Sequence, residues 1–240
     1  MTDDSILSGF SEHIDELRSR LLKSLGALVV TVLASFVFAN QVITILVEPI
    51  GGLEKLQSIE VTENITVFMK VSLLTGFILA LPLITYQVVA FILPGLKPSE
   101  KKWLLLSIPF ITIMFLTGVA FAYFIMLRAA IPFLISFLGV QTIPRLSNYM
   151  GFVTNLMFWV GISFESPLII LILAKLKLVT PKMLIKGWRI AIVISAVLAA
   201  VITPTTDPVN MGLLMAPLLG LYLFSILLAF LVKLTYRQRS

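Results

Sequence analysis

Long apolar runs dominate this sequence, and they restrict the solvent in which it can fold. A helix needs roughly 20 apolar residues to cross the hydrocarbon core of a bilayer, and runs near that length recur between residues 24 and 232. Hydrophobic residues make up 59% of the chain and charged residues 12%, about half the charged share of a soluble domain. The runs are continuous and do not alternate with polar residues, so the sequence predicts an all-α membrane protein and not a β-barrel.

We expect six transmembrane helices within a single domain that covers residues 1–240. The predicted spans are about 24–47, 71–93, 103–127, 149–174, 188–202 and 209–232. The fifth span is short: at 1.5 Å per residue it is about 22 Å long, against roughly 30 Å of hydrocarbon. A further apolar run at 129–138 is too short to cross and is expected to form an interfacial or re-entrant element.

The distribution of cations predicts how these spans are oriented. Of the 18 lysine and arginine residues, 14 fall on the side of the membrane that holds both termini. The other four fall in the opposite loops: Lys55, Lys70, Arg128 and Arg145. Because cytoplasmic loops carry the excess of cations, both termini are expected in the cytoplasm. The opposite loops, about 48–69 and 128–148, are long for simple hairpins and should form structured outer-side loops.

Composition also excludes several kinds of chemistry. The chain has no cysteine, and His13 is its only histidine, so disulfides, thiol chemistry and the usual metal sites are not expected. It carries neither phosphate-binding glycine motif and no Ser/His/Asp set, so we expect no enzyme and no cofactor. The net charge of +6 comes from short clusters between apolar runs, a pattern typical of membrane orientation and not of nucleic-acid binding. The first ten residues hold Asp3 and Asp4 but no cation, so no cleaved signal peptide is expected.

Two isolated acids are candidate sites, and each also has an ordinary structural explanation. Glu165, in "GISFESPLII", lies within the fourth predicted span, where a charge costs on the order of 2.5–3.5 kcal/mol. It is either a protonated group bonded inside the bundle, or the lining of a wet cavity or substrate contact. Pro167 can free a backbone carbonyl beside it. Glu100, in "PGLKPSEKK", is either a surface neutraliser among lysines or an acid held at the headgroup boundary.

A third candidate lies in the charged segment "SEHIDELRSRLL" near the N-terminus. Glu16 falls on the polar face of a predicted amphipathic helix, and Arg18 falls at the edge of its apolar stripe. The stripe consists of Phe10, Ile14, Leu17 and Leu21. By periodicity alone the segment is an interfacial collar, in which Glu16 and Arg20 form an ordinary i,i+4 pair.

Five segments together resemble a known family. "HIDELRSRLL", "FILPGLKPSEKK", "AFAYF", "SFESP" and "TPTTDP" occur in this order across the six predicted spans. The chain thereby resembles, over essentially its whole length, the TatC family, the integral subunit of the twin-arginine protein translocase. The resemblance implies a receptor in the bacterial inner membrane, or its archaeal or thylakoid equivalent, that binds the twin-arginine signal peptides of folded precursor proteins. It also implies a homo-oligomer within a larger complex, assembled with single-span TatA and TatB-type subunits and driven by the proton-motive force.

The resemblance assigns roles to particular residues. Glu165 corresponds to the family's intramembrane polar site, and Pro49 and Asp207 to outer-side positions linked to transport. The implied signal-peptide contacts are Glu16, Glu100, Arg18, Gln87 and Phe91. The chemistry is consistent with this, because two guanidinium groups require two anionic acceptors, and arginine–carboxylate pairs are planar and charge-assisted. The alternative is a proton-coupled small-solute transporter that uses Glu165, although such transporters usually show repeated halves that this sequence lacks.

Overall fold

The computed structural model describes residues 3–95, 98–136, 142–176, 178–202 and 208–237, with side chains omitted at 3–12, 95, 98–100, 103, 208–210, 213 and 233–237. Within these ranges almost every residue is helical, and the one β feature is an isolated bridge between Gln57 and Arg145. The prediction of an all-α fold is therefore confirmed.

Ten α-helices follow one another along the described chain. They are α1 (Asp3–Ser35), α2 (Ala39–Val47), α3 (Glu63–Ile92), α4 (Pro98–Phe121), α5 (Arg128–Ser136), α6 (Leu146–Phe164), α7 (Ser166–Lys175), α8 (Pro181–Lys186), α9 (Trp188–Ile202) and α10 (Pro208–Arg237). Shorter helical segments are η1 (Glu48–Ile50), η2 (Leu53–Lys55), η3 (Leu93–Gly95) and the π-helical η4 (Ala122–Leu127).

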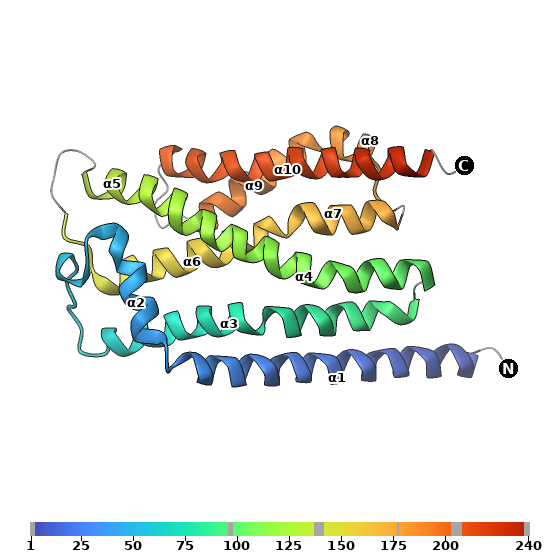
Figure 1. The fold of residues 1–240 in the computed structure, drawn as a ribbon, viewed down its shortest axis with the longest axis horizontal. Coiled ribbons are helices and arrows are strands. Elements are labelled where there is room, and N and C mark those ends of the chain that lie inside the picture. The colour runs from blue at the N-terminus through green and yellow to red at the C-terminus, as the bar shows by residue number, and fades with distance from the viewer. Residues whose placement is uncertain (1–2, 96–97, 137–141, 177, 203–207, 238–240) are drawn as a thin grey trace.

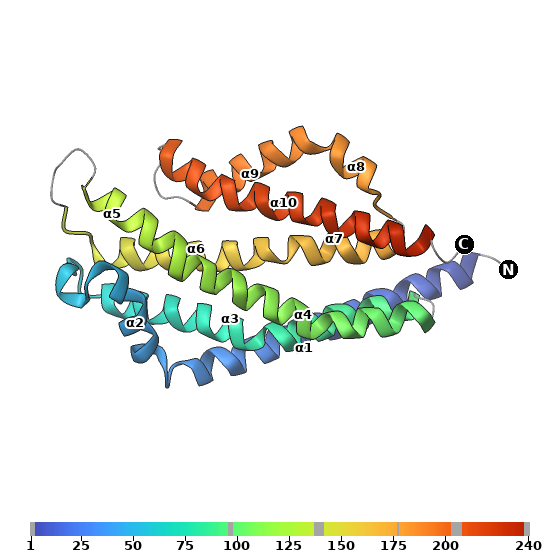
Figure 2. The ribbon, with the colours of Figure 1, turned by 45° about the horizontal axis from the view of Figure 1, so that its top comes forward.

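The long helices run roughly side by side along the long axis of the molecule (Figure 1). Helix α1 begins and α10 ends at the same end of the bundle, and α3 ends and α4 begins there too (Figures 1 and 2). We call this the terminal end. At the opposite end, α2 lies across the bundle near the start of α6. The predicted site residues that the structure describes therefore fall towards the two ends of the bundle, except Glu165, which lies at the junction of α6 and α7 between them.

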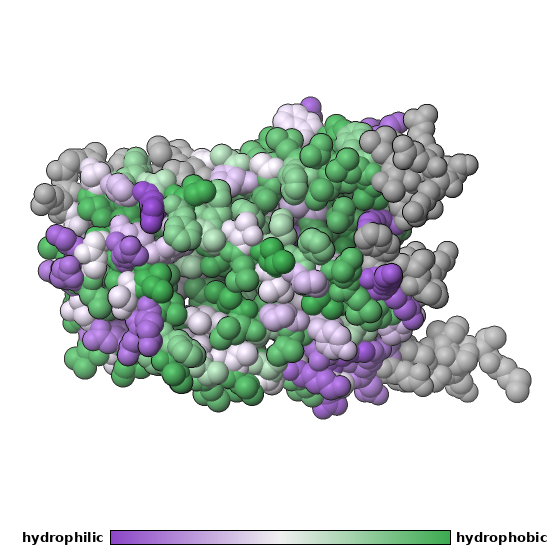
Figure 3. Space-filling model, viewed as in Figure 1, coloured by the Kyte–Doolittle hydropathy of each residue, from purple (hydrophilic) through white to green (hydrophobic). Residues whose placement is uncertain are grey.

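The molecular surface has the polarity of a membrane protein. In the view of Figure 3, hydrophobic side chains cover the middle of the molecule, and hydrophilic side chains gather towards its two ends. Four helical segments of the described chain are long and apolar enough to cross a bilayer: Glu63–Ile92, Leu104–Ser136, Leu146–Lys175 and Leu214–Val232. The chain is therefore a multi-pass membrane protein.

The predicted first span differs from the observed structure, because the helix breaks within it. Segments His13–Ser35 and Ala39–Ile50 are bent by 76° relative to each other. The break at 36–38 follows Ser35, whose hydroxyl donates hydrogen bonds to the carbonyls of Val32 at 2.7 Å and Ser72 at 2.8 Å. A serine that bonds its own helix backbone competes with the helical ladder, and the bond to α3 holds the chain at the break.

The apolar run at 129–138 does not form a separate element over its described residues, which end at Ser136; residues 137 and 138 lie outside them. Helix α5 continues directly from α4 through η4, so that Leu104–Ser136 is one helical segment of 33 residues. Arg128 was the charge that separated the two apolar runs in the sequence. Its guanidinium lies 5.6 Å from the centroid of the Phe124 ring, a favourable cation–π position, so the charge does not end the helix.

Two further helical segments have bounds close to those that the sequence predicts. Helix α9 has the 15 residues expected for the short fifth span. The fourth predicted span comprises α6 and α7, and the break between the two helices falls at Glu165.

Small residues let neighbouring helices approach closely. A Cβ atom on Gly76 of α3 would lie 2.6 Å from the Cα of Val32 on α1, and one on Gly118 of α4 would lie 2.9 Å from the Cα of Gly161 on α6. Close backbone approach at small residues is the usual way in which helices associate in lipid, where the hydrophobic effect does not draw them together. These contacts fix α1 against α3, and so fix the residues that the two helices carry at the terminal end.

Candidate functional site

Glu16 of α1 is the centre of a polar cluster at the terminal end. Its Oε1 accepts two hydrogen bonds from Arg20, from Nη2 at 2.6 Å and from Nε at 2.9 Å. The two residues are one helical turn apart and share a face. The side chain of Glu16 is 29% exposed and that of Arg20 is 25% exposed, so the pair lies at the surface and remains accessible.

The last turns of α3 supply the rest of this cluster. The amide oxygen of Gln87 lies 3.5 Å from Arg20 Nη1. The ring of Phe91 stacks on His13 with centroids 4.4 Å apart, and His13 Nδ1 lies 3.8 Å from Glu16 Oε2. The structure therefore brings three of the predicted signal-peptide residues, Glu16, Gln87 and Phe91, into one place. We call these three residues with His13 and Arg20 the Glu16 cluster.

The other two predicted signal-peptide residues stand apart or are only partly described. Arg18 follows Glu16 by two residues, about 200° around the helix, and lies in a shallow groove with Asp15, Ser19 and Lys23. The structure does not bring it to Glu16. Glu100 lies in the first turn of α4, which begins at the terminal end, and its side chain is outside the described residues.

Glu165 lies between α6 and α7, as the residue that ends one helix and begins the next. Its amide donates to the Ile162 carbonyl at 3.0 Å, and its own carbonyl accepts from the Ile169 amide at 3.0 Å. The side chain is 9% exposed, and neither carboxyl oxygen forms a hydrogen bond with the described residues. Burial of an unbonded acid inside a membrane protein is costly. The position therefore has the properties of a polar site that another group could complete.

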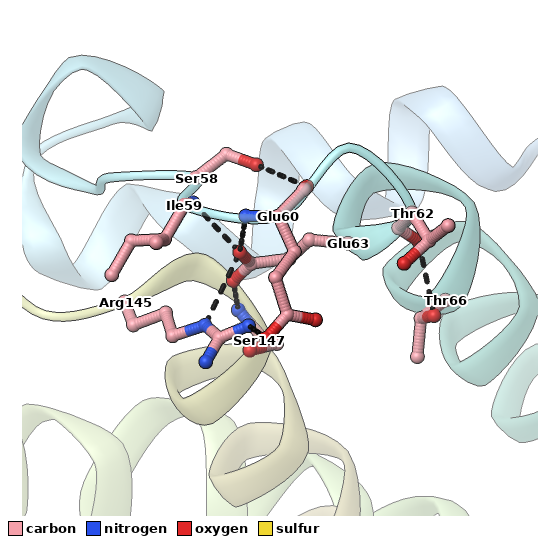
Figure 4. A network of polar contacts seen from close by, with 8 residues as sticks. All are labelled: Ser58, Ile59, Glu60, Thr62, Glu63, Thr66, Arg145 and Ser147. Atoms are coloured by element: carbon pink, nitrogen blue, oxygen red, sulfur yellow. Dashed lines mark hydrogen bonds and ion pairs between the residues drawn. The ribbon is translucent and has the colours of Figure 1, made fainter.

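The opposite end of the bundle holds a polar network that the sequence did not predict (Figure 4). Glu63, at the start of α3, has a fully buried side chain. Its carboxylate accepts hydrogen bonds from the amides of Ile59 at 2.9 Å, Glu60 at 3.4 Å and Ser147 at 2.5 Å, and from Arg145 Nε at 3.2 Å. Arg145 also pairs with Glu60 at 2.7 Å. Hydrogen bonds to Glu60 and Glu63 raise the pKa of the Arg145 guanidinium, so it stays charged.

This network joins the two loops that were expected to be structured. The Gln57 amide donates to the Pro144 carbonyl at 3.1 Å, and the Leu146 amide donates to the Gln57 carbonyl at 2.9 Å. For their described parts, the two loops are therefore structured, as the sequence predicts. Pro49 lies nearby in η1 and is partly buried. Asp207, the other predicted residue of this end, lies outside the described residues.

Two tyrosines attach α2 and η1 to the bundle. The Tyr123 hydroxyl lies 2.8 Å from the Ile45 carbonyl and 3.1 Å from Glu48 Oε2. The Tyr149 hydroxyl donates to the Leu46 carbonyl at 2.8 Å. These bonds reach carbonyl groups in the last turn of α2, where the helix itself offers few donors. The Ile45 carbonyl also accepts the Glu48 amide. No group of three His, Asp or Glu residues in the described chain could hold a metal ion.

Comparison with known proteins identifies the family. The family model for the Sec-independent protein translocase protein (TatC) matches residues 12–217. The chain belongs to the TatC family. It is 36% identical to the TatC protein of Carboxydothermus hydrogenoformans over 225 residues, which are 92% of this chain and 93% of that protein. It is also 36% identical to the chloroplastic TATC of Pisum sativum, over 99% of this chain and 67% of that protein.

The fold agrees with a solved TatC structure. A crystal structure described as the twin arginine translocase receptor TatC superposes with a TM-score of 0.82 at 35% identity, over 92% of this chain and 99% of that one. This TatC-family chain is therefore a component of a protein translocase and not an enzyme. The alternative of a small-solute transporter has no support from these relatives.

Sequence reasoning did not select His13 or Glu63 as site residues. It predicted the Glu16–Arg20 pair, and the structure confirms this contact, which occupies the carboxylate of the main candidate site. Glu63 drew no attention, because an acid at the start of a helix in a polar loop is common. The only sequence feature that pointed to the Glu63 network was Arg145, one of four cations on the opposite side of the predicted spans.

Proposed function

We propose that this chain is the receptor for the twin-arginine signal peptides of folded precursor proteins, and that it binds them at the terminal end. The observation that carries the proposal is the Glu16 carboxylate, which is partly exposed beside Gln87 and binds a guanidinium group in the structure. A crystal structure to which this chain is similar bears the description of a twin arginine translocase receptor. A site that already accepts one arginine has the chemistry to accept another.

Two arginines in a peptide require two acceptors. We assign the second acceptor to Glu100, because α4 begins at the terminal end, where α3 ends and where the Glu16 cluster lies. A lysine ammonium carries its charge at one point and cannot present two parallel donors to a carboxylate, so a Lys-Lys peptide should bind less well. A site bounded by lipid and protein has a lower dielectric than water, which strengthens both pairs. The apolar part of the peptide would then extend along the bundle towards Glu165.

We propose that the terminal end faces the cytoplasm, in the inner membrane of a bacterium or its archaeal or thylakoid equivalent. The excess of lysine and arginine on that side of the chain supports this orientation. Six crossings would comprise the four long apolar segments, the bent pair α1–α2 and the short α9. Since α9 has 15 residues, about 22 Å of helix, the bilayer would have to thin around it.

Transport itself requires other subunits in this proposal. A single chain of 240 residues is too small to enclose a water-filled path for a folded domain. We infer that the receptor nucleates a larger complex with further copies of itself and with single-span TatA and TatB-type subunits, driven by the proton-motive force. In that complex Glu165 is the intramembrane polar site, and Pro49 and Asp207 act on the outer side. Export of a folded cargo by this chain alone in liposomes would contradict the proposal.

Site-specific photocrosslinking tests the receptor function. A photoreactive residue is placed next to Glu16 or Glu100 in the full chain, and a labelled signal peptide is added with either an Arg-Arg or a Lys-Lys pair. We expect strong crosslinks at both positions with Arg-Arg and weak ones with Lys-Lys. The same photoreactive residue at Lys55, in η2 at the opposite end of the bundle, serves as the control. Equal crosslinking of both peptides would rule out twin-arginine recognition at this site.

A further inference from the structure

The Glu16 carboxylate is already occupied in the protein without a peptide. Arg20 directs two N–H groups at a single oxygen, Oε1, at 2.6 and 2.9 Å. Its remaining terminal nitrogen, Nη1, lies 3.5 Å from the Gln87 amide oxygen. The guanidinium of Arg20 therefore makes the kind of contact that a peptide arginine would make, and it does so with two members of the same cluster.

The second carboxylate oxygen is placed differently. Glu16 Oε2 lies 3.8 Å from His13 Nδ1, which is beyond hydrogen-bond distance. The His13 ring is held in turn by its stacking on Phe91. One oxygen of Glu16 is thus taken, and the other has no hydrogen bond from the side chains that the structure describes. A guanidinium that binds both oxygens in the usual two-point geometry has to take Oε1 from Arg20.

From this geometry we propose that Arg20 is an internal competitor of the signal peptide, because its guanidinium must leave Glu16 Oε1 before a peptide guanidinium can bind both carboxylate oxygens. The inference rests on the function proposed above. A peptide arginine replaces Arg20 like for like, since both groups present planar paired donors and one positive charge. The free energy of breaking the Arg20–Glu16 contact is the same for every peptide that displaces Arg20. The competitor therefore lowers the affinity of the receptor for its peptides.

Arg20 differs from the other described cations of α1 because it contacts the Glu16 carboxylate directly. Arg18 and Lys23 line the groove on another face of the helix, and they act on the peptide only through the general positive field. That field is screened over about 8–10 Å at ordinary ionic strength. Arg20, by contrast, is in direct contact with the carboxylate. Removal of Arg20 should therefore have an effect that removal of a neighbouring charge does not.

The test measures the affinity of labelled Arg-Arg and Lys-Lys signal peptides for the full chain in nanodiscs. We expect Arg20→Gln to tighten binding of the Arg-Arg peptide by about two- to fivefold, the range that partly exposed ion pairs allow. A competitor lowers the affinity of every peptide that displaces it by the same factor, so the Lys-Lys peptide should gain no more than the Arg-Arg peptide. Lys23→Gln, which removes the same charge from the same helix, should change both affinities equally and less. Arg20→Lys keeps the charge without the planar fork and should give an intermediate affinity.

Two further variants separate this inference from the receptor function. Glu16→Gln should weaken binding of the Arg-Arg peptide, and Arg20→Gln should then give no added gain in affinity in the Glu16→Gln background. If Glu16→Gln binds like the unmodified protein, the receptor site itself is wrong. If Glu16→Gln loses binding while Arg20→Gln weakens binding of the Arg-Arg peptide or leaves it unchanged, the receptor site stands and the role of Arg20 is overturned. An equal effect of Lys23→Gln and Arg20→Gln would also overturn it.

Discussion

Arg145 and Glu63 are 82 positions apart in the sequence, and Arg145 Nε donates a hydrogen bond to Glu63 Oε2 over 3.2 Å. The contact joins the start of α3 to the residue before α6, and Glu60 closes it from the other side. Glu63 also accepts three backbone amides, from both loops. A single buried carboxylate thus holds together the two segments that cover this end of the bundle (Figure 4).

We expect Arg145→Gln to destabilise this end of the protein. The substitution removes the positive charge opposite a buried carboxylate, and an unpaired buried charge is strongly unfavourable. Thermal unfolding of the purified protein in detergent should show a clearly lower midpoint. Arg128→Gln is the matched control, because Arg128 lies near the same end over the exposed ring of Phe124. Equal midpoints for the two variants would show that the network does not stabilise the fold.

Gly76→Ala should disturb the packing of α1 on α3. The added methyl would lie 2.6 Å from the Val32 Cα, so backbone must move, and overpacking of this kind typically costs about 1–3 kcal/mol. Because α1 carries Glu16 and α3 carries Gln87, peptide affinity should fall together with thermal stability. Gly26→Ala is the control, since a Cβ at Gly26 meets nothing within 4 Å. A Gly76→Ala protein as stable as the Gly26→Ala protein would contradict this packing.

The sequence predicted the helices better than it predicted the contacts between them. The length of the apolar run predicted the bounds of the fifth span, 188–202, and these are the bounds of α9. A short apolar run between a charged residue and a proline leaves few other positions at which the helix can begin and end. The bend after Ser35 was missed, because it depends on a hydrogen bond to Ser72 on another helix. Similarly, Arg128 was taken to end an apolar run, whereas Phe124 one turn earlier accommodates its charge within the helix.

The candidate site was predictable to a similar degree. Helical periodicity and the family motifs selected Glu16, and the structure placed Gln87 and Phe91 beside it. Periodicity could also show that Arg18 and Glu16 point in different directions, because residues two apart on a helix do not share a face. It could not show that Arg20 occupies the carboxylate in preference to solvent, since an exposed i,i+4 pair contributes only a few tenths of a kcal/mol. Arg20 also lies 3.5 Å from Gln87, which belongs to a different helix, and helical periodicity cannot reveal a contact between helices.

Tyr149→Phe should lower stability by about 1 kcal/mol, the usual net contribution of a hydrogen bond between protein groups. The Leu46 carbonyl, which accepts from this hydroxyl at 2.8 Å, would be left unpaired near the end of α2. Chemical unfolding in detergent measures the loss. Tyr86→Phe is the control, because Tyr86 is 49% exposed and its hydroxyl can reach solvent or lipid headgroups. No difference between the two variants would mean that Tyr149 does not hold α2.

Phe91→Ala should weaken binding of the Arg-Arg peptide by between about two- and tenfold. The stack with Phe91 holds His13 beside Glu16, and aromatic pairs contribute about 0.5–1.5 kcal/mol beyond their buried area. Fluorescence anisotropy of a labelled peptide reports the change. Val88→Ala, on the exposed side of the same helix, should leave the affinity unaltered. If both variants bind alike, Phe91 does not contribute to the site.

Glu165→Gln should affect export without affecting signal-peptide binding or thermal stability. Neither carboxyl oxygen of Glu165 forms a hydrogen bond within the described chain, so an amide of the same shape removes no contact, and thermal stability should not fall. The Glu16 cluster lies at the terminal end of α1 and α3, whereas Glu165 lies at the break between α6 and α7, so affinity for the signal peptide should also be unchanged.

Export is expected to behave differently from binding in the Glu165→Gln protein. If Glu165 is completed by a polar group of a partner subunit, as its burial without a hydrogen bond suggests, the amide should support less transport in membranes that contain the whole translocase. Glu54→Gln serves as the control, because Glu54 is an exposed acid of η2, remote from that break. A Glu165→Gln protein that binds peptide normally and exports normally would show that the buried acid has only a structural role.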